Sequence, residues 1–354
     1  MGDVAPVLVG PLLLGPNQPQ RFYRGGSKIA GFRGLAPDGL DGDHLPEDWV
    51  GSATAAFGSD CLGLTRLPDG RLLRDAIGDD PQGYLGPQHA QAFGASPALL
   101  VKLLDAGERL PVHCHPSDAF ARTHLGSAWG KTEAWIVIGA DPGSGVHIGF
   151  TEDVSERALA DWVADQSPAT LRALNRVTVQ PGDAILIPAG LPHAIGAGVF
   201  LVELQEPTDL SIVLEWEPFP IDGPAEAYLG LGSELALSCV DRSGWDPRRL
   251  ASLRRQAGAD SPVTGVFPAA ADPYFAAQWL RPGDAAVALD PGFAILVVLS
   301  GSGLLRTGPG DEMTLRRGMT ILLPYAAGRC EISGRCELIR CLPPNGGHEP
   351  PSGN

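Results

Sequence analysis

The sequence lacks the features that would tie it to nucleic acid or to a membrane. Its 26 Lys and Arg residues are outnumbered by 41 Asp and Glu residues, and the formal net charge is −15 with no basic run to offset it. A surface of that sign repels phosphate backbones and anionic lipid head groups, so we expect neither as a partner. We also find no apolar run long enough to span a bilayer, and the first 16 residues lack the basic start of a signal peptide.

Paired cysteines and aromatic residues are scarce as well. The six cysteines are scattered without C-x-x-C spacing, and we interpret them as reduced thiols in a cytoplasmic protein. Aromatic residues make up only 6% of the chain, whereas it has 46 Gly and 33 Pro. This composition favours short strands joined by tight turns over a helical bundle. We therefore expect a mainly β protein, and its 354 residues favour two domains.

Short apolar runs bounded by Gly, Pro or Asp predict strands in two blocks. The expected ranges are 98–104, 133–138, 176–180, 184–188 and 199–205 in the first block, and 275–280, 293–300, 303–307, 319–323 and 336–341 in the second. Helical insertions are expected at about 151–175 and 224–261. We therefore predict a catalytic β domain over 1–262, a smaller β domain over 263–342 and a disordered tail over 343–354.

Two segments carry the candidate chemistry. Five residues separate Gly107 from His113-Cys114-His115, so the two imidazoles alternate along an extended strand and point to the same side. Gly182-Asp183 opens another strand, which ends in Pro188-Ala189-Gly190-Leu191-Pro192-His193. These spacings match the cupin motifs G-x5-H-x-H and G-x5-P-x-G-x2-H, which implies jelly-roll β-barrels. The carboxylate that usually accompanies the imidazoles is supplied by Glu133.

The predicted metal ligands are thus His113, His115, Glu133 and His193. Three imidazoles and one carboxylate suit a borderline divalent ion, and we expect one Zn²⁺ ion, with Mn²⁺, Fe²⁺ or Ni²⁺ as alternatives. Such a set leaves coordination positions for substrate oxygens or water, as in catalytic sites. The second barrel has no histidine between residues 264 and 342, so we interpret it as structural.

Two residues near these motifs are further candidates. Lys131 stands two residues before Glu133 and is either a solvated lysine at a strand end or an active-site group. Glu203 stands in the apolar run 200–205, where a buried carboxylate is costly without a partner. That cost favours a functional role for Glu203.

Beyond the cupin spacing, the sequence resembles the type I mannose-6-phosphate isomerases, which are zinc cupins that interconvert mannose 6-phosphate and fructose 6-phosphate. The resemblance covers most of the chain and rests on the segments 69–75, 97–104, 115–118, 130–135, 188–195 and 203–205. It implies that His113, His115, Glu133 and His193 bind zinc, and that Lys102, Lys131 and Glu203 are active-site residues. It also implies proton transfer through an enediol, with Glu203 as acid or base.

Three positions depart from the family pattern. The family has Gln at the position of His113, Ser at that of Pro111, and an essential Arg at that of Val213. Valine cannot pair with a phosphate or an enediolate, and we consider Arg24 as a substitute. The departures leave two other functions open: an isomerase or epimerase of an unphosphorylated or different sugar, and a non-catalytic regulatory cupin that binds a sugar. A monomer or a homodimer is expected.

Overall fold

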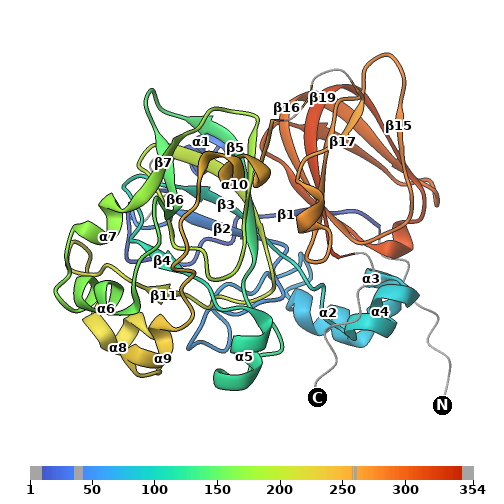
Figure 1. Ribbon diagram of the computed structural model, residues 1–354. Coiled ribbons are helices and arrows are strands. Elements are labelled where there is room, and N and C mark those ends of the chain that lie inside the picture. Colours follow the sequence, from blue (N-terminus) through green and yellow to red (C-terminus); the bar gives the residue numbers. More distant parts are fainter. Residues whose placement is uncertain (1–9, 36–42, 257, 259–260, 345–354) are drawn as a thin grey trace.

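Two β-barrels lie side by side in the computed structural model, which describes residues 10–35, 43–256, 258 and 261–344 (Figure 1). The N-terminal barrel is built from a six-stranded and a five-stranded sheet, and the C-terminal barrel from one eight-stranded sheet. All the strand pairs within these sheets are antiparallel. The predicted mainly β architecture with two cupin barrels is confirmed.

The two sheets of the N-terminal barrel contain all five strands predicted in the first block, with ends that differ from the prediction by at most two residues. The six-stranded sheet has the order β12 (Arg254–Gln256), β8 (Asp183–Ile187), β5 (Glu133–Ala140), β10 (Val199–Gln205), β3 (Leu100–Asp105) and β2 (Glu47–Val50). The five-stranded sheet has the order β11 (Ile212–Val213), β4 (His113–Cys114), β9 (His193–Ile195), β6 (Gly145–Phe150) and β7 (Leu174–Thr178). Every residue of β3, β8 and β10 is buried, because both faces of these strands are covered.

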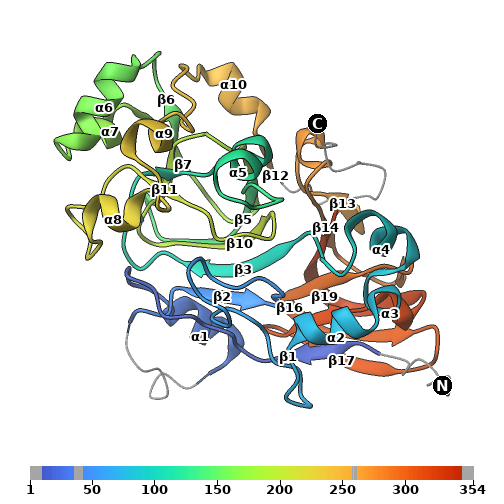
Figure 2. The ribbon, with the colours of Figure 1, turned by 90° about the horizontal axis from the view of Figure 1, so that it is seen from below.

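Helices cover the outside of this barrel and the region below the C-terminal one (Figures 1 and 2). They are α1 (Ser27–Arg33), α2 (Leu73–Asp79), α3 (Pro81–Leu85), α4 (Pro87–Phe93), α5 (Asp118–His124), α6 (Glu156–Ala164), α7 (Ala169–Arg172), α8 (Gly223–Ala227), α9 (Ser233–Leu237) and α10 (Pro247–Ser252). The predicted insertions contain α6 to α10, but the second also contains β12, which extends the six-stranded sheet. Among the described helices, none has the length and hydrophobicity needed to cross a membrane.

The C-terminal barrel differs from the prediction at several places, and three of its strands (263–265, 287–289 and 312–316) were not expected. Its strands are β13 (Val263–Gly265), β14 (Ala276–Leu280), β15 (Val287–Leu289), β16 (Ala294–Thr307), β17 (Glu312–Arg316), β18 (Thr320–Leu323) and β19 (Cys330–Leu342). The two strands expected at 293–300 and 303–307 are one strand, because the register shift between Val298 and Ser300 leaves β16 paired with β19 on both sides. In addition, β1 (Leu12–Leu14) pairs with β18, so residues 12–14 belong to this sheet and not, as the sequence predicts, to the first domain. Residues 345–354 of the predicted tail lie outside the described residues.

One hydrophobic core joins the two barrels. It contains Val101 and Trp135 from the first barrel together with Val297 and Ile339 from the second, all nearly inaccessible to solvent. Each buried side chain of this size contributes roughly 1.5–3 kcal/mol to stability. The second barrel therefore supports the six-stranded sheet, from which β3, β5 and β10 present residues to the site described next.

Candidate metal centre and active site

Three histidines converge at the end of the five-stranded sheet. His113 in β4 lies directly opposite His193 in β9, and His115 follows β4. The centroids of the His113 and His193 rings are 4.2 Å apart, and a ligating nitrogen of each of the three rings lies within 4.8 Å of those of the other two. The strand pairing thus brings together two sequence segments 80 residues apart (113 and 193) and forms a group that could hold a metal ion.

The backbone fixes the orientation of each imidazole. Nδ1 of His113 lies 2.8 Å from the carbonyl oxygen of Pro111, Nδ1 of His115 lies 2.9 Å from that of Leu210, and Nδ1 of His193 lies 2.8 Å from that of Leu191. A carbonyl oxygen only accepts hydrogen bonds, so each Nδ1 carries the proton and donates it. The lone pair is then on Nε2, which is the tautomer that a metal-binding histidine needs.

Glu133, the first residue of β5, places its carboxylate against the same nitrogens. Its Oε2 lies 3.0 Å from His115 Nε2, and its Oε1 lies 3.3 Å from His193 Nε2. Trp135 Nε1 donates to Oε1 over 3.0 Å. Within the described part of the chain, Glu133 Oε2 and His193 Nε2 are buried atoms that form no hydrogen bond. A divalent cation would satisfy both, so these residues fit a metal ion.

Burial and neighbouring charges set the protonation states that metal binding requires. Burial and the other two histidines lower the pKa of His113 well below its ordinary value, and burial together with Lys131 lowers the pKa of His115 to about 3. Burial alone would raise the pKa of Glu133, but the Lys131 ammonium 3.0 Å from Oε2 and His115 lower it well below the usual value. The imidazoles of His113 and His115 are therefore neutral and the Glu133 carboxylate is ionised at neutral pH.

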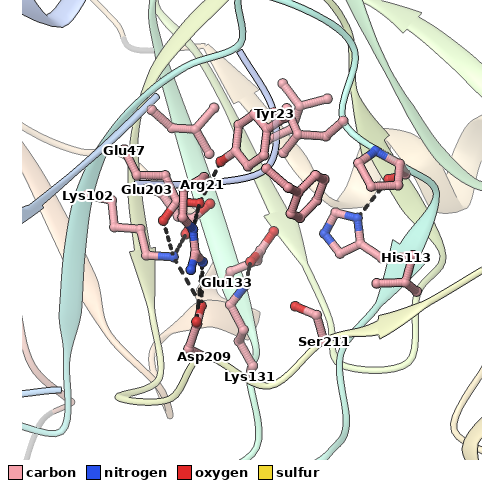
Figure 3. A pocket seen from close by; sticks show the side chains of 16 residues that line it. Arg21, Tyr23, Glu47, Lys102, His113, Lys131, Glu133, Glu203, Asp209 and Ser211 are labelled. Atoms are coloured by element: carbon pink, nitrogen blue, oxygen red, sulfur yellow. Dashed lines mark hydrogen bonds and ion pairs between the residues drawn. The ribbon is translucent and has the colours of Figure 1, made fainter. Parts of the chain in front are cut away.

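A pocket opens beside this cluster (Figure 3). Its lining includes the three predicted active-site residues Lys102, Lys131 and Glu203, together with His113 and Glu133. Glu203 in β10 is the register partner of Lys102 in β3, and the Lys102 ammonium lies 3.5 Å from Glu203 Oε1. The four predicted metal ligands and the three predicted active-site residues thus lie within or directly beside one pocket.

The pKa of Glu203 is higher than that of an ordinary glutamate. Burial raises it first, and the nearby Glu133 carboxylate raises it further, against the opposing effect of Lys102 and Lys131. A carboxyl group with a raised pKa exchanges protons more readily near neutral pH, which suits an acid or base. Burial alone would lower the pKa of Lys102, but Glu47 and Glu203 raise it, so this lysine stays cationic.

Several lining residues were not proposed from sequence as site residues. They are Arg21, Tyr23, Glu47, Asp209 and Ser211. No motif marks Arg21, which stands in an irregular segment before α1 and reaches the pocket only through the fold. Glu47 and Asp209 flank Lys102, with carboxylate oxygens 3.4 Å and 3.9 Å from its Nζ. These acids could have been suspected only as partners for a buried lysine.

The proposal that Arg24 takes the place of the family arginine is wrong. The Arg24 side chain is 64% exposed, pairs with Asp43 at 3.4 Å and is not among the residues that line the pocket. Val213 in β11 does line the pocket and pairs in register with His113. The guanidinium present in the pocket is that of Arg21, which reaches it from three residues earlier in the chain.

Glu206 holds the segment that carries Lys131 and Glu133. Its Oε2 accepts a hydrogen bond of 2.6 Å from the backbone of Thr132, and its own backbone N–H donates to the Thr132 carbonyl over 3.1 Å. Burial and a hydrogen bond with Asp118 raise the pKa of Glu206 to about 9. Tyr274 of the second barrel also faces this group, and burial raises its pKa. At neutral pH, Glu206 is therefore the protonated member of a carboxyl pair.

We expect this proton to make stability depend on pH. An unfolded glutamate titrates near pH 4.3, so between about pH 4.3 and 9 the folded protein keeps a proton that the unfolded chain has lost. Stability therefore falls as pH rises through this window, and Glu206→Gln, which mimics the neutral acid, should remove the loss. Between pH 5 and 8, the free energy of unfolding of the variant, measured in urea, should increase relative to that of the wild type by up to about 1.4 kcal/mol per pH unit. A difference in the free energy of unfolding that does not change with pH would contradict this expectation.

The fold and this cluster define a cupin with a histidine-rich candidate metal site. Residues 267–343 match the family model for the mannose-6-phosphate isomerase cupin domain. The mannose-6-phosphate isomerase of Streptococcus mutans is 28% identical over 73% of this chain and 79% of its own length. The mannose-6-phosphate isomerase ManA of Bacillus subtilis is 25% identical over 93% of this chain and 98% of its own length.

A solved structure has the same fold. It is a mannose 6-phosphate isomerase bound with zinc and yttrium, which superposes with a TM-score of 0.71 and 18% identity over 95% of this chain and 100% of that one. By sequence, the chain is thus similar to the mannose-6-phosphate isomerases, which agrees with the resemblance that the motifs carry.

Proposed function

We propose that the protein interconverts mannose 6-phosphate and fructose 6-phosphate with one divalent metal ion, Zn²⁺ first among the candidates. His113, His115, Glu133 and His193 would hold the ion, and when bound it would polarise the carbonyl and hydroxyl oxygens of the open-chain sugar. The observation that carries the proposal is Glu203, a buried carboxyl group that lies 3.5 Å from Lys102 in the pocket beside those ligands. The relatives bearing this activity support the choice of sugar.

The chain's own side chains would move the proton. Glu203 would take the proton from C2 of the aldose, and the C–H electron pair would form the C1–C2 double bond while the carbonyl oxygen becomes negative. Return of the proton to C1, with transfer of the hydroxyl proton from O2 to the negative O1, gives the ketose. Lys131, whose Nζ lies 3.0 Å from Glu133 and 3.1 Å from His115 Nε2, would donate to the sugar oxygens at the metal end of the pocket. Lys102 would keep Glu203 oriented.

A second candidate is an isomerase of an unphosphorylated sugar. The pocket lining has three cationic residues (Arg21, Lys102 and Lys131) and four carboxylates (Glu47, Glu133, Glu203 and Asp209). Each cation lies within 4 Å of at least one of these carboxylates, so none is an unmatched charge for a phosphate dianion.

One experiment tests both candidates. Elemental analysis of the purified protein should find one divalent ion per chain, and a coupled isomerase assay should find turnover of mannose 6-phosphate far above that of free mannose. A preference for the free sugar would favour the second candidate. A metal-loaded protein that turns over neither sugar would contradict both and leave a sugar-binding regulatory role.

We also propose a setting for the reaction. All six cysteines are free thiols, and four of them are buried, which supports a cytoplasmic location. The substrate would be the small-molecule partner, and the protein would act as a monomer or a homodimer.

A further inference from the structure

Arg21 presents a partly free guanidinium to the pocket. Its Nε donates to Glu47 Oε1 over 2.9 Å, and its Nη2 donates to Asp209 Oδ1 over 2.9 Å and to Oδ2 over 3.2 Å. Within the described residues, no hydrogen bond is formed by Nη1. The Arg21 side chain is 20% exposed, whereas those of Glu47 and Asp209 are 5% and 9% exposed. Two buried acids therefore fix the guanidinium in place, while one nitrogen keeps its donors for another acceptor.

The surrounding charges indicate what kind of acceptor fits. Figure 3 shows Arg21, Lys102, Glu47, Glu203 and Asp209 gathered on one side of the pocket, with His113 and Ser211 on the other. With Glu203 ionised, this group of five residues has two positive and three negative charges. A phosphate dianion placed there would face a net negative charge, which is unfavourable at these short distances.

Proton transfer to Glu203 changes that balance. Once Glu203 has taken the proton from carbon, the five residues carry two positive and two negative charges, and the negative charge has moved onto a substrate oxygen. The guanidinium is then the partly exposed cation of the group, because Lys102 is only 3% exposed. A fixed donor that meets charge only as it develops stabilises the transition state more than the ground state.

We propose that Arg21 is a catalytic residue whose Nη1 donates a hydrogen bond to the sugar oxygen that becomes negative when Glu203 removes the proton. This inference rests on the proposed isomerase function and assigns the anion to the enediolate oxygen, not to the phosphate group. The residue enters the site from the irregular segment between β1 and α1, far in sequence from Lys102, Glu203 and Asp209.

Arg21→Lys tests the proposal while keeping the positive charge between Glu47 and Asp209. An ammonium cannot bond both acids and also direct a third donor in the same plane. We expect kcat for mannose 6-phosphate to fall by about 10²–10³-fold, which is the usual effect of removing one such donor, while KM changes little. The metal content should stay at one ion per chain. As the matched control, Arg109→Gln removes another half-buried arginine, paired with Glu215 at 2.7 Å but absent from the pocket lining, and should keep kcat.

Inhibition separates the enediolate from the phosphate. Arg21→Lys should weaken inhibition by a sugar hydroxamate, an anionic analogue of the enediolate, and should leave inhibition by inorganic phosphate unchanged. Selective loss of phosphate inhibition, or a rise in KM at constant kcat, would make Arg21 a phosphate ligand and overturn the proposal. Unchanged kinetics would also overturn it, by showing a purely structural role.

Failure of the proposed function would be recognised separately. If the metal-loaded wild type does not isomerise mannose 6-phosphate, calorimetric binding of the hydroxamate and of a neutral sugar alcohol replaces the assay. Arg21→Lys should then weaken binding of the hydroxamate and leave binding of the sugar alcohol unchanged. Equal binding of the hydroxamate by wild type and variant would contradict the role assigned to Arg21.

Discussion

Replacing Glu203 by glutamine is expected to lower kcat for mannose 6-phosphate by about 10²–10⁴-fold, which is the usual contribution of a positioned acid or base. The amide has nearly the same size and keeps a hydrogen-bonding group near Lys102, but it cannot accept a proton from carbon. Binding of the sugar should change much less than turnover, so KM should stay within a few fold of the wild type. The measurement is steady-state kinetics in the direction of fructose 6-phosphate formation.

Loss of the buried carboxylate could also disturb the fold, and a matched variant distinguishes the two effects. Asp183→Asn neutralises another buried carboxylate, at the start of β8, which pairs with Arg254 at 3.4 Å and does not line the pocket. It should retain turnover even if its stability falls. Glu203→Gln protein with undiminished isomerase turnover would exclude Glu203 as the acid or base.

The strands around the site could be predicted because their sequences are locally distinctive. The run 199–205 is apolar at nearly every position, and its observed strand, β10, has the predicted bounds because both faces are covered. The three histidine ligands could also be predicted from the sequence, because the spacing of His113 and His115 and the turn before His193 are local features. Once a barrel brings the segments around His113 and His193 together, these local spacings are enough to form the predicted cluster of ligands.

The other side of the pocket depends on contacts between distant segments. Arg21 meets Asp209 across 188 residues, and no periodicity or motif marks either of them. Arg24 was the residue that we considered from sequence, yet its side chain is exposed. The ion pairs of a pocket are set by tertiary geometry, so a sequence can indicate that a buried Lys102 needs acids without indicating which ones supply them.

Replacement of His193 by alanine is the second change for which we expect a large loss of activity. His193→Ala deletes a fully buried ring whose Nε2 lies 3.3 Å from Glu133 and whose orientation is set by the Leu191 carbonyl. The three remaining ligands would hold the ion too weakly to survive purification, and kcat should fall by roughly 10³-fold or more because polarisation of the sugar oxygens is worth several kcal/mol. Elemental analysis should find much less than one ion per chain.

Thermal unfolding distinguishes lost metal binding from lost structure. A metal that binds only the folded state at 100 times its dissociation constant stabilises that state by about 2.7 kcal/mol, so added Zn²⁺ should raise the Tm of metal-stripped wild type. His193→Ala should show little or no such rise. His89→Ala, which removes a buried histidine bonded to the Ser96 carbonyl outside the pocket, should lower the starting Tm yet respond to Zn²⁺ as the wild type does. An equal Zn²⁺ response in His193→Ala would show that the ion binds elsewhere, because a site that loses one of four ligands cannot keep its affinity unchanged.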